Sequence, residues 1–355
     1  CTKNLPDVAV TPSEHFNTLI WSGDGNSTRS LTGVGFQPDW TWHKVRSHAG
    51  SHMLYDSVRG TTKRLHSDQS VAEAVESAEG TVTSFDSDGF SVNTGSSNNF
   101  YTNQSGNTYV AWNWKANGSG SSNTDGTITS TVSANVDAGF SIVSYTGNGT
   151  DGATVGHGLS KAPEIIIIKG RTGSGYPWAV FGYPTNSAFP YDGSLLQLES
   201  TNAMATSTSK ELSLGASTVT FVDSGGDING NTLTYIAYAF HSVDGYSKVG
   251  SYTGNGNADG TFVYTGFRPK YVMWKRSNDS GGWTIWDDAR DSDNEMDKYF
   301  YADSAASEFS GANLRVDFLS NGFKPRTTNV WGNASGSTYI YIAFAETPFK
   351  YSNAR

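Results

Sequence analysis

Three stretches of this chain repeat one series of landmarks in the same order. Each opens with an aromatic residue and a Gly-x-Gly turn, at residues 23–25, 147–149 and 254–256. Each continues with a proline followed six residues later by a lysine, at Pro38/Lys44, Pro163/Lys169 and Pro269/Lys275. The copies are about 105 to 125 residues apart, which suits whole β-sandwich domains and is too long for a solenoid or propeller repeat. Three related modules favour surface coverage or multivalent contact over one catalytic centre.

The composition indicates strands joined by tight turns. The 40 Gly, 18 Tyr, 18 Phe and 10 Trp combine turn formers with residues that suit pleated strands. We therefore expect an all-β fold of three tandem antiparallel β-sandwich modules, of jelly-roll or concanavalin-like type. The expected bounds are 16–117, 138–245 and 246–355, with 1–15 as an extended lead-in and 118–137 as a Gly/Ser/Asn/Thr-rich linker. Modules two and three adjoin almost without a spacer, so we expect them to be rigidly joined and module one to be hinged.

Some local patterns predict single elements. Ile165–Ile168 is an apolar run typical of a strand that is buried on both faces. The pairs Asp88-Gly89 and Asn321-Gly322 predict hairpin turns. Val71–Ala78, followed by Gly80, is the segment that best fits a short helix.

Charge and cysteine content restrict the partners. The net charge is −9 and no basic stripe is present, which argues against a nucleic-acid partner. No apolar run has the length of a membrane span, so we expect no membrane insertion. The single cysteine is Cys1, which excludes an internal disulfide bond. An initial cysteine fits either an acylated lipoprotein or, as we favour, a fragment of a longer chain.

An aspartate and an arginine three residues apart form the most distinctive local motif. They occur as Asp56/Arg59 and as Asp287/Arg290, whereas module two has Val180-Phe181-Gly182 at the matching place. An ion pair that fixes a strand-to-loop corner is the interpretation we favour, and a polar ligand site is the alternative. The repeated lysines Lys44, Lys169 and Lys275 are expected to point outward from their strands.

Acidic residues cluster after the second of these motifs. Asp291, Asp293 and Glu295 could supply the oxygen ligands that Ca²⁺ prefers, although a solvated loop is the ordinary interpretation of such a run. Calcium is the only cofactor that we consider. Glycan hydrolysis would need two carboxylates about 5 to 10 Å apart, and no carboxylate pair recurs in the three modules. No nucleophile elbow, phosphate loop or dinucleotide fingerprint is present, so we expect a protein that is not an enzyme.

The aromatic surplus suggests a carbohydrate-binding surface, because Trp and Tyr rings stack on sugars. Repeated aromatics are better explained as core residues. Aromatics that do not recur are therefore the candidates for exposed ligand contacts: Tyr176, Trp178, Tyr183 and Tyr191.

The repeated block resembles modules of bacteriophage tail fibres and related adhesive virion proteins, particularly those of phages of marine bacteria. The resemblance is carried by residues 33–44, 54–60, 84–90 and 109–114, and module two departs from it most. The segment Cys1–Pro6 is similar to the one that follows a SPRY-like domain in such proteins. The resemblance implies a virion location and transfers no catalytic residue.

We therefore expect a non-enzymatic virion protein of tail-fibre or spike type that binds host-surface glycan multivalently, contacts other virion proteins and forms a homotrimer. A capsid-decorating or otherwise architectural virion protein is the first alternative. A polysaccharide depolymerase and a lipid-anchored cellular adhesin are weaker ones.

Overall fold

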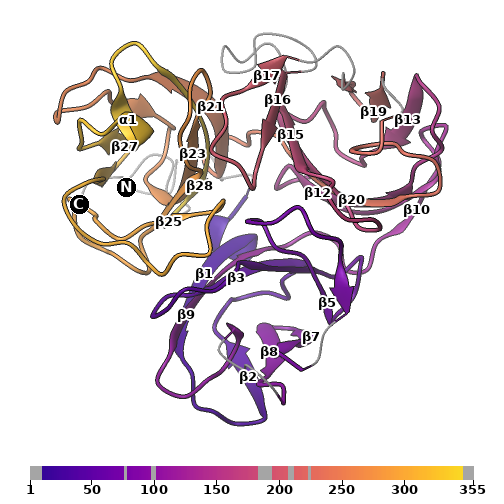
Figure 1. Cartoon of the computed structure of the whole chain (residues 1–355), viewed down its shortest axis with the longest axis horizontal. Helices are drawn as coiled ribbons and strands as arrows, with labels where there is room; N and C mark the ends of the chain where they lie inside the picture. Colours follow the sequence, from indigo (N-terminus) through magenta and orange to yellow (C-terminus); the bar gives the residue numbers. More distant parts are fainter. Residues whose placement is uncertain are drawn as a thin grey trace, which may run out of the picture.

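A computed structural model of the chain describes residues 10–75, 78–96, 101–182, 194–206, 212–222 and 225–346. The regular secondary structure of the described residues consists almost entirely of antiparallel strands, which confirms the predicted all-β class. Figure 1 shows three lobes grouped around a common centre. We name them lobe 1 (16–117), lobe 2 (118–245) and lobe 3 (246–346), because each contains one copy of the sequence repeat.

Each lobe is built on a larger antiparallel sheet with the same four-strand succession. In lobe 1 the order is β1 (Phe16–Ser22), β9 (Thr108–Trp114), β3 (Trp40–Val45) and β4 (Met53–Asp56). In lobe 2 the matching strands are β12 (Phe140–Thr146), β20 (Thr234–Phe240), β14 (Ile165–Gly170) and β15 (Trp178–Gly182). In lobe 3 they are β21 (Ser247–Thr253), β28 (Thr338–Ala345), β23 (Pro269–Arg276) and β24 (Thr284–Asp287).

A smaller three-stranded sheet faces each larger one. Its strands are, in lobe 1, β2 (Thr28–Thr32), β8 (Gly89–Asn93) and β7 (Thr81–Asp86). In lobe 2 they are β13 (Ala153–Gly156), β19 (Thr218–Phe221) and β18 (Leu212–Leu214). In lobe 3 they are β22 (Val263–Tyr264), β27 (Gly322–Pro325) and β26 (Val316–Leu319). The same strand order in all three lobes explains why the sequence landmarks recur in the same order.

The segment expected to be a linker is partly a strand region. Residues 118–137 contain β10 (Ser121–Asn123) and β11 (Ser130–Asn135), and β11 pairs with β12 so that both extend the larger sheet of lobe 2. Polar strands of this kind are tolerated at a sheet edge, where one face meets water. The remaining additions are β16 (Ser194–Gln197) and β17 (Ala205–Thr206) in lobe 2 and β25 (Phe300–Tyr301) in lobe 3.

The helix expected at 71–78 is not formed in its described part. Ala74–Val75 is instead strand β6, paired with β5 (Lys63–Arg64). The backbone N–H of Glu73 donates to Arg171 O in lobe 2 at 2.9 Å, so an inter-lobe bond holds this segment extended. The described residues do include two short helical elements, the 3₁₀ turn η1 (Pro12–Glu14), within the predicted lead-in, and α1 (Val330–Asn333).

Two of the local predictions are confirmed. Asp86 pairs with Gly89 and Leu319 with Gly322, so both predicted hairpins exist. Ile165–Ile168 lies in β14, where every residue is buried.

The repeated Gly-x-Gly turn has a common structural cause. A Cβ on the first glycine, Gly23, Gly147 or Gly254, would come within 2.0 to 2.4 Å of a backbone oxygen. That oxygen belongs to the loop that precedes β9, β20 or β28. A buried asparagine of the same loop accepts a hydrogen bond, through its side-chain oxygen, from the backbone N–H of the middle residue of the turn. The asparagines are Asn103, Asn229 and Asn333, each six residues before the tyrosine of its strand.

The hydrophobic core has four parts. Each lobe has its own core between its two sheets, and a fourth core forms where the opposite faces of the three larger sheets meet. In this central core Trp40 of lobe 1 stacks on Tyr238 of lobe 2 at 4.2 Å, and Phe16 stacks on Phe344 of lobe 3 at 4.9 Å. Lobe 1 is therefore packed against both other lobes, in contrast to the expected hinge.

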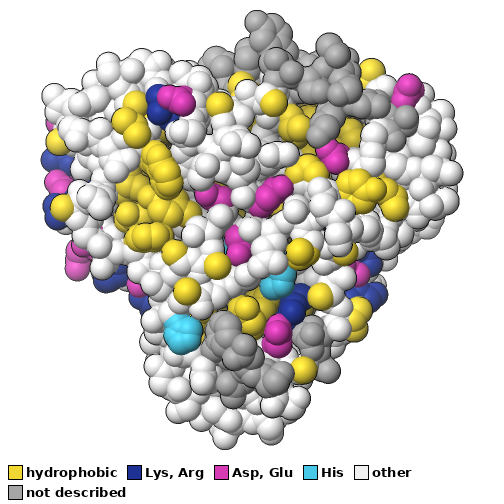
Figure 2. Space-filling view, viewed as in Figure 1, with side chains coloured by type: hydrophobic (Ala, Val, Ile, Leu, Met, Phe, Trp, Pro, Cys, Tyr) yellow, Lys and Arg dark blue, Asp and Glu magenta, His cyan; other side chains and the backbone are white. Residues whose placement is uncertain are grey.

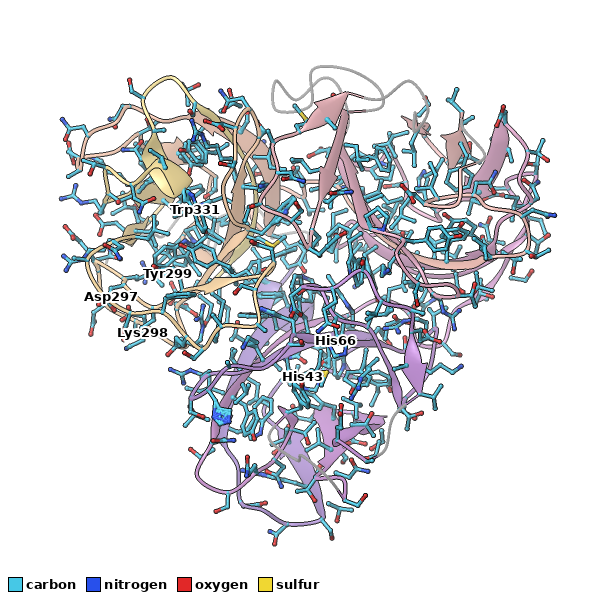
Figure 3. The ribbon with its side chains drawn as sticks, in the orientation of Figure 1. His43, His66, Asp297, Lys298, Tyr299 and Trp331 are labelled. Carbon is cyan, nitrogen blue, oxygen red and sulfur yellow. The ribbon has the colours of Figure 1, made fainter. Side chains whose placement is uncertain are left out.

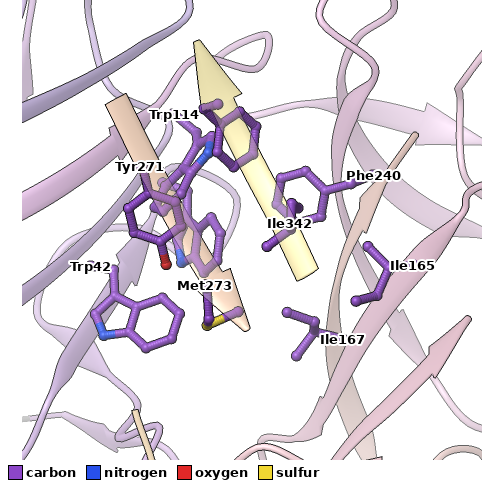
Figure 4. A pocket seen from close by; sticks show the side chains of 10 residues that line it. Trp42, Trp114, Ile165, Ile167, Phe240, Tyr271, Met273 and Ile342 are labelled. Atoms are coloured by element: carbon purple, nitrogen blue, oxygen red, sulfur yellow. The ribbon is translucent and has the colours of Figure 1, made fainter. Parts of the chain in front are cut away.

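A small cavity of about 10 Å³ lies inside the central core (Figure 4). It is lined by side chains of all three lobes, including Trp42, Ile165 and Met273. A volume of that size corresponds to about one water molecule, and a water needs two or more polar partners. The lining is apolar, so the cavity is a packing defect of the centre and not a ligand site.

Candidate functional site

The two Asp–Arg motifs form buried ion pairs. Arg59 Nε lies 2.5 Å from Asp56 Oδ2, and Arg290 Nε lies 2.5 Å from Asp287 Oδ2. All four side chains are completely buried. Each arginine also donates to a carbonyl of its own strand, that of Leu54 or of Ile285. Each pair thus fixes the corner that follows its strand.

Each corner also contacts a neighbouring lobe. Tyr238 of lobe 2 donates its hydroxyl to Asp56 at 2.7 Å, and Trp112 of lobe 1 donates its indole N–H to Asp287 at 2.9 Å. The corner of lobe 1 therefore faces lobe 2, and that of lobe 3 faces lobe 1. An aspartate that is matched with both an arginine and a neighbouring ring donor is a structural element of the junction.

A second carboxylate extends each of these networks. Glu73 accepts from Arg59 at 3.0 Å and from Arg171 of lobe 2 at 2.9 Å. Glu308 accepts from Arg290 at 3.1 Å and from Arg46 of lobe 1 at 2.9 Å. Burial alone would raise the pKa of Glu73, but Arg171 and Arg59 outweigh it and hold this pKa below its usual value.

The third junction, between lobes 2 and 3, replaces this network with uncharged residues. Gly182 occupies the position of the two corner aspartates, and Ile342 occupies the position of the ring donors Tyr238 and Trp112. Met204 replaces the glutamates, and Ser277 replaces Arg46 and Arg171, the arginines of the neighbouring lobe. The backbone bond is kept, since Met204 N donates to Ser277 O at 2.8 Å as Glu73 N does to Arg171 O. The absence of the Asp–Arg motif from repeat two is therefore accompanied by uncharged residues, Ile342 and Ser277, on the lobe 3 side of the same junction.

The repeated lysines are buried, in contrast to the expected outward orientation. Lys44 donates to Ala305 O of lobe 3 at 3.3 Å and Lys169 to Ser70 O of lobe 1 at 3.1 Å, while Lys275 donates to Gly281 O in its own lobe. They lie on the strand face that enters the central core. Burial lowers the pKa of each lysine to about 8.

Ring donors bind across the junctions at another matched position. Trp178 donates to His66 O at 2.7 Å and Trp283 to Gln197 O at 2.8 Å. In lobe 1 the residue at the matching position is His52. Its Nδ1 accepts from the Trp42 indole, so its Nε2 carries the proton and donates to Tyr301 O of lobe 3 at 3.0 Å.

The aromatics predicted as ligand contacts do not form a site in the described structure. Trp178 has no exposed surface, because it belongs to the junction just described. Tyr176 is half-buried, and its ring covers Gly170, Gly173 and Gly226. Tyr183 and Tyr191 lie outside the described residues.

The predicted calcium ligands point to different partners. Asp291 accepts from the backbone N–H of Asp297 at 2.7 Å, and Glu295 pairs with Arg315 at 3.1 Å and with Arg326 at 3.2 Å. Asp293 is exposed. Within the described ranges no three His, Cys, Asp or Glu side chains are grouped so that they could hold a metal ion.

Three neighbouring aromatic rings of lobe 3 are partly exposed. Tyr301, Phe309 and Trp331 are the partly buried hydrophobic residues over the core of lobe 3, and we name them the aromatic surface cluster. Tyr301 lies 5.1 Å from Phe309 and 4.8 Å from Trp331 between ring centroids, and Phe309 stacks on the buried Tyr299 at 5.3 Å. A hydrophobic patch marks this part of lobe 3 in Figure 2, and Figure 3 labels Tyr299 and Trp331 there.

The surrounding backbone holds these rings in place. Trp331 lies in α1, and its backbone N–H donates to the Asn329 side chain at 2.9 Å. The backbone carbonyl of Trp331 accepts from the Trp274 indole at 3.2 Å. A Cβ on Gly282 would lie only 2.7 Å from Tyr301 Cδ1 and 3.2 Å from Trp331 Cζ3. The two rings can therefore lie this close to the backbone of residue 282 only because that residue is glycine.

Sequence reasoning missed this cluster although a signal was present. Trp331 stands two residues before the repeated Asn333, where the other repeats have Tyr101 and Asp227. It is thus a tryptophan in repeat three alone, although repeat one also has an aromatic residue there. Recurrence is a poor guide to exposure in this chain, because Trp178 has the counterpart Trp283 and both are buried at inter-lobe junctions.

The fold and this geometry define an all-β protein with three like lobes and an aromatic surface site on one of them. The chain belongs to the family described as "Domain of unknown function (DUF7483)", whose profile matches residues 11–348. Neither the curated proteins nor the solved structures contain a match to the chain. Of the residues that the structure describes, none form a helix with the length and hydropathy that a membrane crossing requires.

Proposed function

We propose that the chain is a non-enzymatic bacteriophage virion protein of tail-fibre or spike type that attaches to host-surface glycan. The aromatic surface cluster is the observation that carries this proposal. Most of the large aromatic rings in the described structure are buried in the cores, whereas Tyr301, Phe309 and Trp331 are partly exposed to water. Rings held rigidly at a surface lose little conformational entropy on binding, which favours affinity.

The rigid assembly of the lobes supports the same proposal. An attachment protein transmits force between a particle and a cell, and the buried networks between the lobes suit that task. The buried ionisable groups of the two corner networks serve the junctions, so they are not free for hydrolysis. Because the three lobes differ in surface chemistry, multivalency would come from several chains per particle, such as the expected homotrimer, and not from three equal sites in one chain.

Binding of the labelled chain to intact bacteria, with competition by extracted surface polysaccharide, tests this function. We expect saturable binding that the polysaccharide displaces and that Trp331→Ala abolishes. Tyr264→Ala is the matched control, because Tyr264 is 65% exposed but lies outside the cluster. Release of reducing sugar from a bound polysaccharide would contradict the non-enzymatic assignment.

An architectural role on the virion is the second candidate. The observation that favours it is the rigid three-lobed body itself, which needs no ligand to be useful in a particle. A folded chain that binds no bacterial strain, and is present in hundreds of copies per virion, would favour this role. A copy number of about 3 to 18, as symmetric fibres have, would favour attachment.

A further inference from the structure

A polar loop of lobe 2 lies beside the aromatic surface cluster of lobe 3. This loop, residues 199–204, connects β16 to β17. Gly281 N donates to Thr201 O at 2.9 Å, and Met204 N donates to Ser277 O at 2.8 Å, so two inter-lobe bonds hold it. Thr201, which forms the first of these bonds, and its neighbour Asn202 are exposed.

Two glycines separate this loop from the rings. Gly281 is the residue that bonds Thr201, and a Cβ on it would lie 3.9 Å from Trp331 Cα. The next residue, Gly282, lies against Tyr301 and Trp331. Neither glycine has a side chain, so on this strip only glycine backbone lies between the polar loop and the aromatic cluster, with the Arg276 side chain beside Gly281.

We propose that the cluster and loop 199–204 form one composite site for a neutral polysaccharide, with Thr201 and Asn202 as specificity-determining residues. This inference rests on the proposed attachment function. The rings supply flat apolar faces for the C–H face of a pyranose, and the loop supplies a hydroxyl and an amide that can bond sugar hydroxyls. A site that combines aromatic walls with a few polar groups is typical of small-ligand recognition.

The charges around the site favour a neutral ligand. Arg276 is paired with Asp279 at 2.9 Å, Lys298 lies 3.8 Å from Asp291, and the buried Lys275 donates to Gly281 O, so these three cations already have partners within the lobe. The chain as a whole carries a net charge of −9. An acidic polysaccharide would therefore meet a protein of net negative charge on which Arg276, Lys298 and Lys275 are already engaged.

The composite site depends on the docking of lobes 2 and 3. Its aromatic wall belongs to lobe 3 and its polar wall to lobe 2, at the junction that lacks the charged network. The junction at which repeat two lacks the Asp–Arg motif is thus the one at which loop 199–204 of lobe 2 contacts lobe 3.

Binding to fractionated polysaccharide tests the inference. The probes are the neutral and acidic anion-exchange fractions of polysaccharide extracted from a strain that the native chain binds, immobilised for biolayer interferometry. We expect binding to the neutral fraction, loss of binding for Trp331→Ala, and about tenfold weaker binding for the Thr201→Ala/Asn202→Ala variant, since each lost ligand hydrogen bond weakens binding several-fold. Ser121→Ala/Ser122→Ala, on the exposed edge strand β10, is the matched control and should bind as the native chain does.

The outcomes separate this inference from the function on which it rests. Native affinity in the loop variant together with loss of binding in Trp331→Ala would overturn the composite site and leave glycan attachment standing. Preference for the acidic fraction would overturn the neutral class. Native affinity in Trp331→Ala would remove the site from the cluster altogether. If the native chain binds no strain at all, the attachment function itself fails. Unchanged thermal unfolding of each variant ensures that lost binding is not lost folding.

Discussion

Two buried tyrosines illustrate how single polar atoms determine stability in this molecule. Tyr238 donates its hydroxyl to Asp56 across a lobe junction at 2.7 Å. Tyr246 is as deeply buried, but its hydroxyl has no hydrogen-bond partner among the described residues. A hydrogen bond to a charged group contributes more than a neutral one, whereas an unpaired buried hydroxyl is a cost.

We therefore predict opposite results for the same substitution at these two sites. Tyr238→Phe should lower the free energy of unfolding by about 2 kcal/mol, because Asp56 loses a charge-assisted bond. Tyr246→Phe, the matched control, should leave it unchanged or raise it by up to about 1 kcal/mol. Urea unfolding followed by tryptophan fluorescence measures both. Equal losses in the two variants would show that the hydroxyl–Asp56 bond has no net value.

His43 provides a residue-scale prediction about acid. Its ring is completely buried near Trp21, Tyr55 and Phe90, and neither ring nitrogen has a described partner. Burial lowers the pKa of His43 to about 3. Between pH 6.5 and 3 the unfolded chain therefore takes up a proton that the folded chain excludes, so stability falls as the pH falls.

Repeat two has Ile168 at the position of His43, which suggests the variant to test. Relative to the native chain, His43→Ile should gain about 3 kcal/mol of stability between pH 7 and pH 4, because one pKa unit corresponds to about 1.4 kcal/mol. Urea midpoints at pH 7, 5.5 and 4 measure this gain. A constant difference between variant and native chain across that range would contradict it.

At the scale of the element, the strands β3, β14 and β23 each carry a lysine into the protein interior. The pKa of each is lowered by burial to about 8, below the ordinary value of 10.5. Between these two values the unfolded chain keeps a proton that the folded chain has released. Stability should therefore rise as the pH increases through this window.

The expected rise is at most about 3 kcal/mol per lysine, following the same conversion of pKa into free energy. Lys169→Met should reduce the increase in unfolding free energy between pH 8 and 9.5. Lys161→Met is the matched control, because the Lys161 side chain is half exposed. Chemical unfolding at several pH values in this range measures the slope. A slope that Lys169→Met leaves unchanged would show that the lysine stays charged in the folded chain.

The strands themselves were largely predictable, and their neighbours were not. The alternation in Thr108–Trp114 and the run Ile165–Ile168 predict strands because local pattern and burial agree there. Residues 71–75 have a helical composition, yet an inter-lobe bond through Glu73 holds them extended. The polar segment Ser130–Asn135 looks like a linker, yet a partner strand is available for it. Tertiary contacts override local preference in both cases.

On the scale of the whole molecule, the central core joins buried residues of all three lobes in one cluster. A separated lobe would expose the outer face of its larger sheet, which in lobe 1 carries Trp40, Trp112 and Trp114. One-step unfolding is usual for small single domains, and here the shared core would extend it to all three lobes.

We predict that the chain unfolds in one transition in urea, with the same midpoint by far-ultraviolet circular dichroism and by tryptophan fluorescence. Asp287→Ala, at the junction of lobes 3 and 1, should cost about 3 kcal/mol, because Arg290 loses its closest carboxylate and the buried Trp112 indole loses its acceptor, while Glu308 still pairs with Arg290. It should shift the whole transition, and hydrogen exchange should show faster opening in all three lobes. Exchange that accelerates in lobe 3 alone would mean that the lobes unfold independently.

The sequence by itself determined the all-β class and the Asp–Arg corner motifs, because turn residues, strand composition and short spacings act locally along the chain. Only the tertiary structure decided which side chains are inside. Lys169 and Trp178 look exposed in sequence and are buried, and Trp331 reaches the surface, because the outer faces of the three larger sheets pack against one another. That packing joins residues more than a hundred positions apart, and no local pattern encodes which face of a strand meets a neighbouring lobe.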